Sequence, residues 1–117
     1  MSETETHIGK LRKVDLQGLT VEQWAEAKCR ESGMTELSSY TNTWKEQLLD
    51  HNNNYHKYFF YEGDVYEAFE HTEIEERDVD ILTKNDDGTY NFVMQFYNGG
   101  TCLSEMIEDA LKRENNP

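Results

Sequence analysis

The sequence has little proline, little cysteine and no long hydrophobic run, and each shortage excludes a class of protein. The single proline among the 117 residues is Pro117, so no proline-marked linker divides the chain. Two cysteines, Cys29 and Cys102, are too few for a disulfide framework, and the first residues do not resemble a signal peptide. No apolar run approaches the roughly 20 residues that cross a bilayer. We therefore expect one domain in the reduced environment of the cytoplasm, without a membrane role.

Positive charge is also scarce, which argues against direct binding of DNA or RNA. Eleven Lys and Arg face 24 Asp and Glu, giving a formal net charge of -13. Proteins that bind nucleic acid draw much of their affinity from basic side chains that neutralise phosphates. The only basic cluster here is Lys10, Arg12 and Lys13. We expect no direct nucleic-acid partner.

The acids are concentrated in the second half of the chain. Residues 58–117 hold fifteen acids and only four bases. The densest stretch, residues 62–87, contains eleven acids against Arg77 and Lys84. Such crowding opposes compactness by self-repulsion, so it either serves solubility or attracts a positively charged partner.

The aromatic content predicts a folded domain rather than an acidic disordered tail. Aromatic residues make up 12% of the chain, whereas disordered acidic segments lack them. Residues 1–8 are polar and without periodicity, which predicts a flexible tail, and residues 9–117 are predicted to form a single α+β domain. Ile8 to Leu16 alternates loosely and is compatible with a short strand or an extended lead-in.

Three helices are predicted from capping signals and apolar spacing. Thr20 and Gln23 form a capping box that starts a helix from Val21 to about Glu31, and Thr43 starts a second one over residues 44–51. A final helix follows the Asn98–Gly100 break. Its apolar stripe recurs at helical spacing, through Leu103, Met106, Ile107, Ala110 and Leu111.

Four strands are predicted between the second and third helices, over residues 55–61, 65–72, 79–83 and 90–97. Their aromatic and β-branched residues alternate, and the Asp87-Gly88 pair is a hairpin signal. Phe92 and Met94 are expected to face the core opposite Val79 and Ile81. The predicted fold is a four-stranded antiparallel meander, with two helices before it and a C-terminal helix, the helices packing on one face.

No metal site, cofactor or catalytic site is predicted. His51 and His56, His71, Cys29 and Cys102 do not form the CxxC or HxxxH units that mark zinc sites. Cys102 near a helix start could be an activated nucleophile, but nearby carboxylates would raise its pKa. We predict a protein that is not an enzyme, and an enzyme or metal protein built on Cys102 and the histidines stays the third alternative.

The acidic stretch is the predicted binding site. Alternate strand residues lie about 6.6 Å apart, close to the spacing of phosphates along a nucleic-acid strand, so an acidic row could mimic DNA. The expected partner is a basic host or phage protein, and nucleic-acid-binding proteins are one class of such partners. Tyr61 and Tyr66 are the predicted anchors. The predicted acidic contacts are Asp64, Glu67, Glu70, Asp78, Asp80, Asp86 and Asp87.

The end of the chain resembles small acidic phage proteins. The resemblance covers about the last thirty residues and is carried by the run Phe96-Tyr97-Asn98-Gly99-Gly100-Thr101-Cys102-Leu103-Ser104-Glu105, a strand that enters an acidic helix through Tyr-Asn-Gly-Gly. It implies a phage or mobile-element origin, the host cytoplasm, and a role such as inhibition of a host protein. The alternative from another class is a small structural or assembly protein that forms a homodimer through a sheet edge or its last helix.

Overall fold

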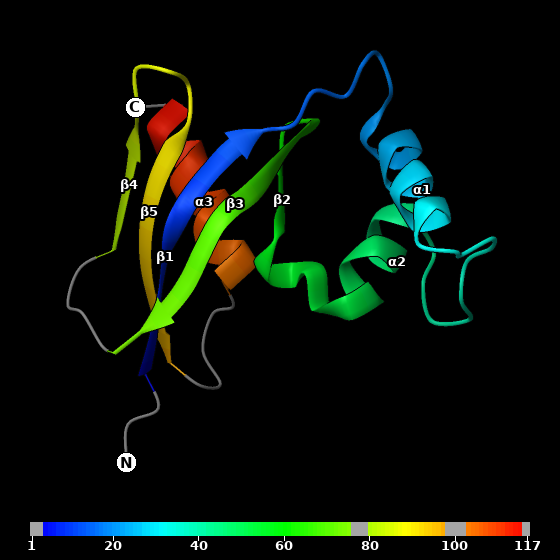
Figure 1. Ribbon diagram of the computed structural model, residues 1–117, viewed down its shortest axis with the longest axis horizontal. Helices are drawn as coiled ribbons and strands as arrows, with labels where there is room; N and C mark the ends of the chain where they lie inside the picture. The colour runs from blue at the N-terminus through cyan, green and yellow to red at the C-terminus, as the bar shows by residue number, and fades with distance from the viewer. Residues whose placement is uncertain (1–3, 76–79, 98–102, 116–117) are drawn as a thin grey trace.

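The computed structural model describes residues 4–75, 80–97 and 103–115, and it has one five-stranded antiparallel sheet with three α-helices (Figure 1). The elements in chain order are β1 (Thr4–Lys13), α1 (Val21–Glu31), α2 (Trp44–Asp50), the 3-10 helix η1 (His51–His56), β2 (Tyr58–Tyr61), β3 (Asp64–Ile74), β4 (Ile81–Lys84), β5 (Tyr90–Tyr97) and α3 (Leu103–Asn115). The α+β class is therefore confirmed.

The predicted four-stranded meander is wrong, because the first strand lies at the centre of a five-stranded sheet. The strand order is β2-β3-β1-β5-β4, so β1 separates β3 from β5. The predicted tail of residues 1–8 overlaps this strand, which begins at Thr4. Thr6 and His7 are both buried. Their polar side chains gave no hydrophobic signal, and pairing of β1 with two neighbours places them inside the fold.

The capping signals located the first two helices correctly. The Thr20 N–H donates to Gln23 Oε1 at 2.9 Å, and the Gln23 N–H donates to Thr20 Oγ1 at 3.1 Å, which completes the predicted capping box. The Glu22 carboxylate of α1 accepts hydrogen bonds from the first two backbone N–H groups of α2. This contact joins the two helices into one unit, because it satisfies donors that α2 cannot satisfy internally.

The helices pack on both faces of the sheet, so the predicted packing on one face is also wrong. α3 covers one face of the sheet, called here the inner face, and the core between them is the inner core. In the inner core, side chains of α3 pack against side chains of the strands: Leu103, Ile107, Ala110 and Leu111 against Leu11, Phe59, Tyr66, Tyr90, Phe92 and Met94. On the opposite face, at the β2 edge, α1 and α2 form a second core with Tyr58, Phe60 and Val65. The adjacent residues Phe59 and Phe60 thus serve different cores, as strand alternation requires. In Figure 1, α3 lies behind the sheet, whereas α1 and α2 lie beside β2.

The edge strands differ from the prediction in two ways, the start of β2 and the register of β4. Tyr55 and His56 belong to η1 rather than to β2. Ile81 pairs with Val93, so it lies on the face opposite Phe92, and Leu82 takes the predicted place beside Phe92. Val79 lies outside the described residues. A register change of one residue exchanges the two faces of a strand.

Candidate functional site

The acids predicted on β3 are neutralised by bases on the neighbouring strand β1. Glu70 lies 3.5 Å from Lys10 Nζ and Asp64 lies 3.3 Å from Lys13 Nζ. The Arg12 guanidinium donates to Glu67 Oε1 through both Nε and Nη2, at 3.0 and 2.8 Å. The basic cluster of Lys10, Arg12 and Lys13 therefore lies across from three of the seven predicted acidic contacts. This part of the sheet surface carries both charge signs, and it does not form a continuous acidic face.

The two predicted tyrosine anchors pack inward. Tyr66 is 5% exposed and belongs to the inner core, where burial raises its pKa to about 12. Tyr61 is half-buried and packs against the same core. Because both rings are occupied within the fold, they do not offer the exposed aromatic surface that anchors an interface.

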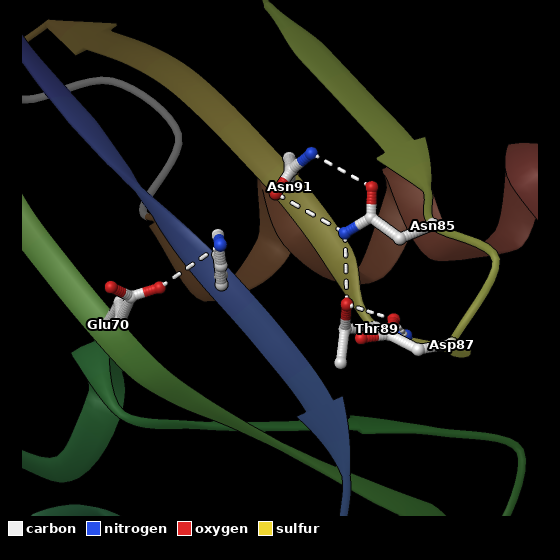
Figure 2. A network of polar contacts seen from close by, with 6 residues as sticks. Glu70, Asn85, Asp87, Thr89 and Asn91 are labelled. Atoms are coloured by element: carbon white, nitrogen blue, oxygen red, sulfur yellow. Dashed lines mark hydrogen bonds and ion pairs between the residues drawn. The ribbon is translucent and has the colours of Figure 1, made fainter.

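The remaining predicted acids lie at the β4–β5 hairpin. Asp80, Asp86 and Asp87 are exposed, whereas Asp78 lies outside the described residues. Asp87 accepts hydrogen bonds from the Thr89 N–H and hydroxyl, which lower the pKa of its carboxyl (Figure 2). Asp80 accepts from the Gln95 N–H at 2.7 Å. Asp87 therefore stays charged at neutral pH while it also shapes the turn.

The turn of this hairpin is held by side-chain hydrogen bonds. Asn85 and Asn91 exchange amide hydrogen bonds at 3.0 and 3.3 Å, and the Asn85 amide also donates to Thr89 Oγ1 at 2.9 Å (Figure 2). Gly88 has φ +88°, a left-handed conformation that glycine adopts without strain. Asp86 and Asp87 are therefore presented on an ordered turn, whereas Asp80 lies at the other end of β4.

The hairpin also forms the accessible edge of the sheet. β4 is outermost, and among the described residues no strand pairs with its outer side. Ile81 is 39% exposed, and Thr83 and Lys84 are exposed too. The opposite edge strand, β2, is largely buried by the two cores. An edge strand presents unpaired backbone donors and acceptors, so β4 is the surface that can accept another strand.

A second cluster was not foreseen from the sequence and contains three of the four histidines. His7 of β1 is 0% exposed, and its Nδ1 lies 2.7 Å from Nε2 of His71 on β3. His56, at the end of η1, has its ring centroid 5.2 Å from that of His7. Glu73 adds a carboxylate 4.0 Å from His7 Nδ1. The ligand atoms of His7, His56 and Glu73 lie within 4.8 Å of one another.

Strand register explains why these residues converge. His7 pairs with Glu73 and Gly9 pairs with His71 across β1 and β3, which places the side chains at 7, 71 and 73 on the inner face. His56 joins them because η1 contacts α3 on that face. The four residues lie in three separate segments, so no short spacing marks them. The only local signal is the spacing of two between His71 and Glu73 on a strand.

The other residues weighed for chemistry lie apart from this cluster. His51 begins η1 and is not in the group of candidate ligands. Cys29 is buried in the second core, where its thiol donates to the Trp44 carbonyl at 3.7 Å and burial raises its pKa. Cys102 lies outside the described residues.

Comparison with known proteins adds no assignment. No protein-family model, curated protein sequence or solved structure matches this chain. Among residues 4–75, 80–97 and 103–115, no helix has both the length and the apolar character that membrane crossing needs.

The histidine cluster predicts a loss of stability in mild acid. Desolvation, together with His7 and His56, lowers the pKa of His71 below 6.5, and Glu73 acts in the opposite direction. The folded state then binds fewer protons than the unfolded state, so stability falls as pH drops below about 6.5 towards the lowered pKa. Urea unfolding at pH 7.5 and 5.5 should show a decrease that is smaller in His71→Gln. An equal decrease in the wild type and in His71→Gln would show that His71 is not the cause of the acid sensitivity.

Proposed function

We propose that this protein is a non-enzymatic binding protein that presents the acidic β4–β5 hairpin and the β4 edge to a basic protein. The observation that supports this most is the position of β4, an accessible edge strand flanked by the exposed acids Asp80 and Asp86. The paired acids on β3 contribute less, because bases on β1 already neutralise them. The interface is accordingly smaller than the whole predicted acidic row.

The exposed backbone and side chains of β4 indicate what kind of partner could bind there. An extended segment can add to β4 through backbone hydrogen bonds, with Ile81 supplying an apolar contact. Lysine or arginine on that segment would meet Asp80 and Asp86 at the two ends of the strand. The net charge of -13 would speed the encounter with a basic protein and make it sensitive to salt.

The proposal also covers the origin of the protein and the kind of protein that it binds. We infer a protein of phage or mobile-element origin that acts in the cytoplasm, where it binds and inhibits a basic host protein or binds a basic phage protein. Mimicry of DNA has less support than strand addition, because the row Asp64, Glu67 and Glu70 is paired with bases. A homodimer through β4 is the second candidate, and it is favoured by the same exposed edge and Ile81.

Reversing the charge of Asp86 tests the proposal. Capture of basic proteins from a bacterial lysate by Asp86→Lys should be about fivefold to tenfold weaker than capture by wild type, because one favourable charge contact becomes repulsive. Asp109→Lys on α3 is the matched control, since it makes the same charge change on an exposed helix position.

Salt and oligomeric state separate the alternatives. Wild-type capture should weaken steeply as ionic strength rises. Equal capture by Asp86→Lys, Asp109→Lys and wild type would refute the proposed edge. A salt-insensitive dimer seen by light scattering, and lost in Ile81→Lys, would favour the assembly role instead.

A further inference from the structure

We propose that His7, His56 and Glu73 bind a divalent transition-metal ion of the zinc class, and that His71 positions the ring of His7. This inference is independent of the proposed partner, because the cluster lies on the inner face of the β1–β3 pair, whereas β4 forms the far edge.

The donor set suits zinc. Two imidazoles and one carboxylate are common zinc ligands, and three protein ligands leave a fourth position for water or another group. Hard ions such as Mg²⁺ and Ca²⁺ instead favour sites built from oxygen ligands. Cobalt, nickel and copper share the preference for imidazole, so they should bind the same site.

The geometry needs only a small contraction. Tetrahedral zinc with bonds of about 2.0 Å holds its ligand atoms about 3.3 Å apart. The ligand atoms of the three residues already lie within 4.8 Å of one another. Glu73 is exposed and His56 is half-buried, so both side chains have room to move towards the buried His7.

The ligands come from three segments that pack together independently of any ion. β1 and β3 are paired from Thr6 to Lys13 of β1, and η1 connects α2 to β2 and contacts α3. Three of the four histidines in the chain meet here, although they are separated by 49 and 15 positions in the sequence. A preformed arrangement lowers the ordering cost that a flexible site would carry.

His71 has the position of a residue that orients a ligand. Its Nε2 lies 2.7 Å from His7 Nδ1, so one of the two rings donates a proton and the other accepts it. When His7 Nδ1–H donates to His71, the tautomer of His7 is fixed with Nε2 as its metal-binding nitrogen, and the exposed Glu73 carboxylate, which lies 4.0 Å from Nδ1, has to turn towards Nε2. In this arrangement His71 Nε2 is the acceptor and its own proton sits on Nδ1.

Titration of the purified full chain with Zn²⁺ tests the site. Isothermal titration calorimetry at pH 7.5, in excess Mg²⁺ to suppress weak binding to surface carboxylates, should give one Zn²⁺ per chain. Co²⁺ should give the visible absorption of a tetrahedral complex with the same stoichiometry. Binding should release protons and weaken at pH 5.5, because protons compete for the two imidazoles.

Single substitutions test which residues bind the metal ion. His56→Ala and Glu73→Gln alter residues that are not fully buried, so both proteins should fold, which circular dichroism can verify; each should lose the one-to-one binding. His71→Gln should retain the stoichiometry with about 10-fold to 100-fold weaker affinity. His51→Ala is the matched control, a histidine five residues from His56 that lies outside the ligand group, and it should bind like wild type.

Three results would overturn the metal site. The first is no stoichiometric Zn²⁺ binding by the folded wild type. The second is wild-type affinity in both His56→Ala and Glu73→Gln. The third is an equal loss in His51→Ala, which would assign the signal to histidines in general. Asp86→Lys should leave Zn²⁺ binding unchanged, so failure of the partner proposal is distinguishable from failure of the metal site.

Discussion

Replacing Gly9 with alanine is expected to destabilise the fold by at least about 2 kcal/mol, through a steric conflict with the backbone of β3. A Cβ at position 9 would overlap the carbonyl oxygen of Glu70 and come within 2.8 Å of its carbonyl carbon. Backbone atoms of a central strand cannot rotate away, so β1 and β3 would have to separate. The expected fall in melting temperature is about 10 °C.

The control for Gly9→Ala is Gly63→Asn, in the turn between β2 and β3. Gly63 has φ +80° with no atom within 4 Å of an added Cβ, and asparagine tolerates this conformation better than other residues. It should change the melting temperature much less. Gly9→Ala should also weaken Zn²⁺ binding, because it moves His7 relative to His71. Equal stability of Gly9→Ala and wild type would mean that β1 and β3 are not in this register.

Replacing Phe59 with alanine should remove about 3 to 5 kcal/mol of stability. Phe59 is 0% exposed and lies in the inner core, between β2 and α3. The substitution removes a large buried ring and leaves a cavity that the surrounding strand and helix cannot fully close. Because a domain of this size is stable by only about 5 to 15 kcal/mol, a large share of the protein should be unfolded in mild urea.

Phe69→Ala supplies the matched comparison for Phe59→Ala. Phe69 is 39% exposed at the irregular register between β1 and β3, where the Arg12 guanidinium lies 5.1 Å from its ring centroid. Losing this contact should cost about 1 kcal/mol or less. Urea unfolding followed by circular dichroism measures both variants. If they lose equal stability, the assignment of Phe59 to the core and Phe69 to the surface is incorrect.

Local signals in the sequence located most of the helices and strands. The Thr20–Gln23 capping box set the start of α1, and the apolar stripe through Leu103, Ile107 and Leu111 identified α3. The aromatic alternation of β5 also placed its inner side correctly, at Phe92 and Met94. These features depend on residues close together in the chain, which is why propensity and periodicity could reveal them.

The order of the strands in the sheet could not be predicted from such local signals. β1 carries polar residues such as Thr6 and His7 on positions that the fold buries, so its hydropathy resembled that of a tail. Its central place depends on pairing with β3 and β5, which lie some sixty and eighty residues further along the chain. Such long-range pairing has no local sequence signature.

The wrong prediction for β1 also explains the errors in the predicted binding site and the missed histidine cluster. With β1 beside β3, Lys10, Arg12 and Lys13 neutralise acids that were predicted to face a partner. The same pairing brings His7 to His71 and Glu73, which no short spacing in the sequence connects. Asp80, Asp86 and Asp87, in or beside the local β4–β5 hairpin, kept the exposed position expected of them, and Glu70 is exposed too although Lys10 lies beside it.

The central claim is that β1 lies between β3 and β5, since the charge pairs and the histidine cluster both depend on it. The most direct test is a nuclear Overhauser experiment on the labelled protein, observing backbone protons of Gly9. Contacts from Gly9 to both His71 and Phe92 are predicted, because Gly9 pairs with each of them. Random-coil shifts for residues 4–13, or direct contacts between β3 and β5, would contradict the fold and the sites built on it.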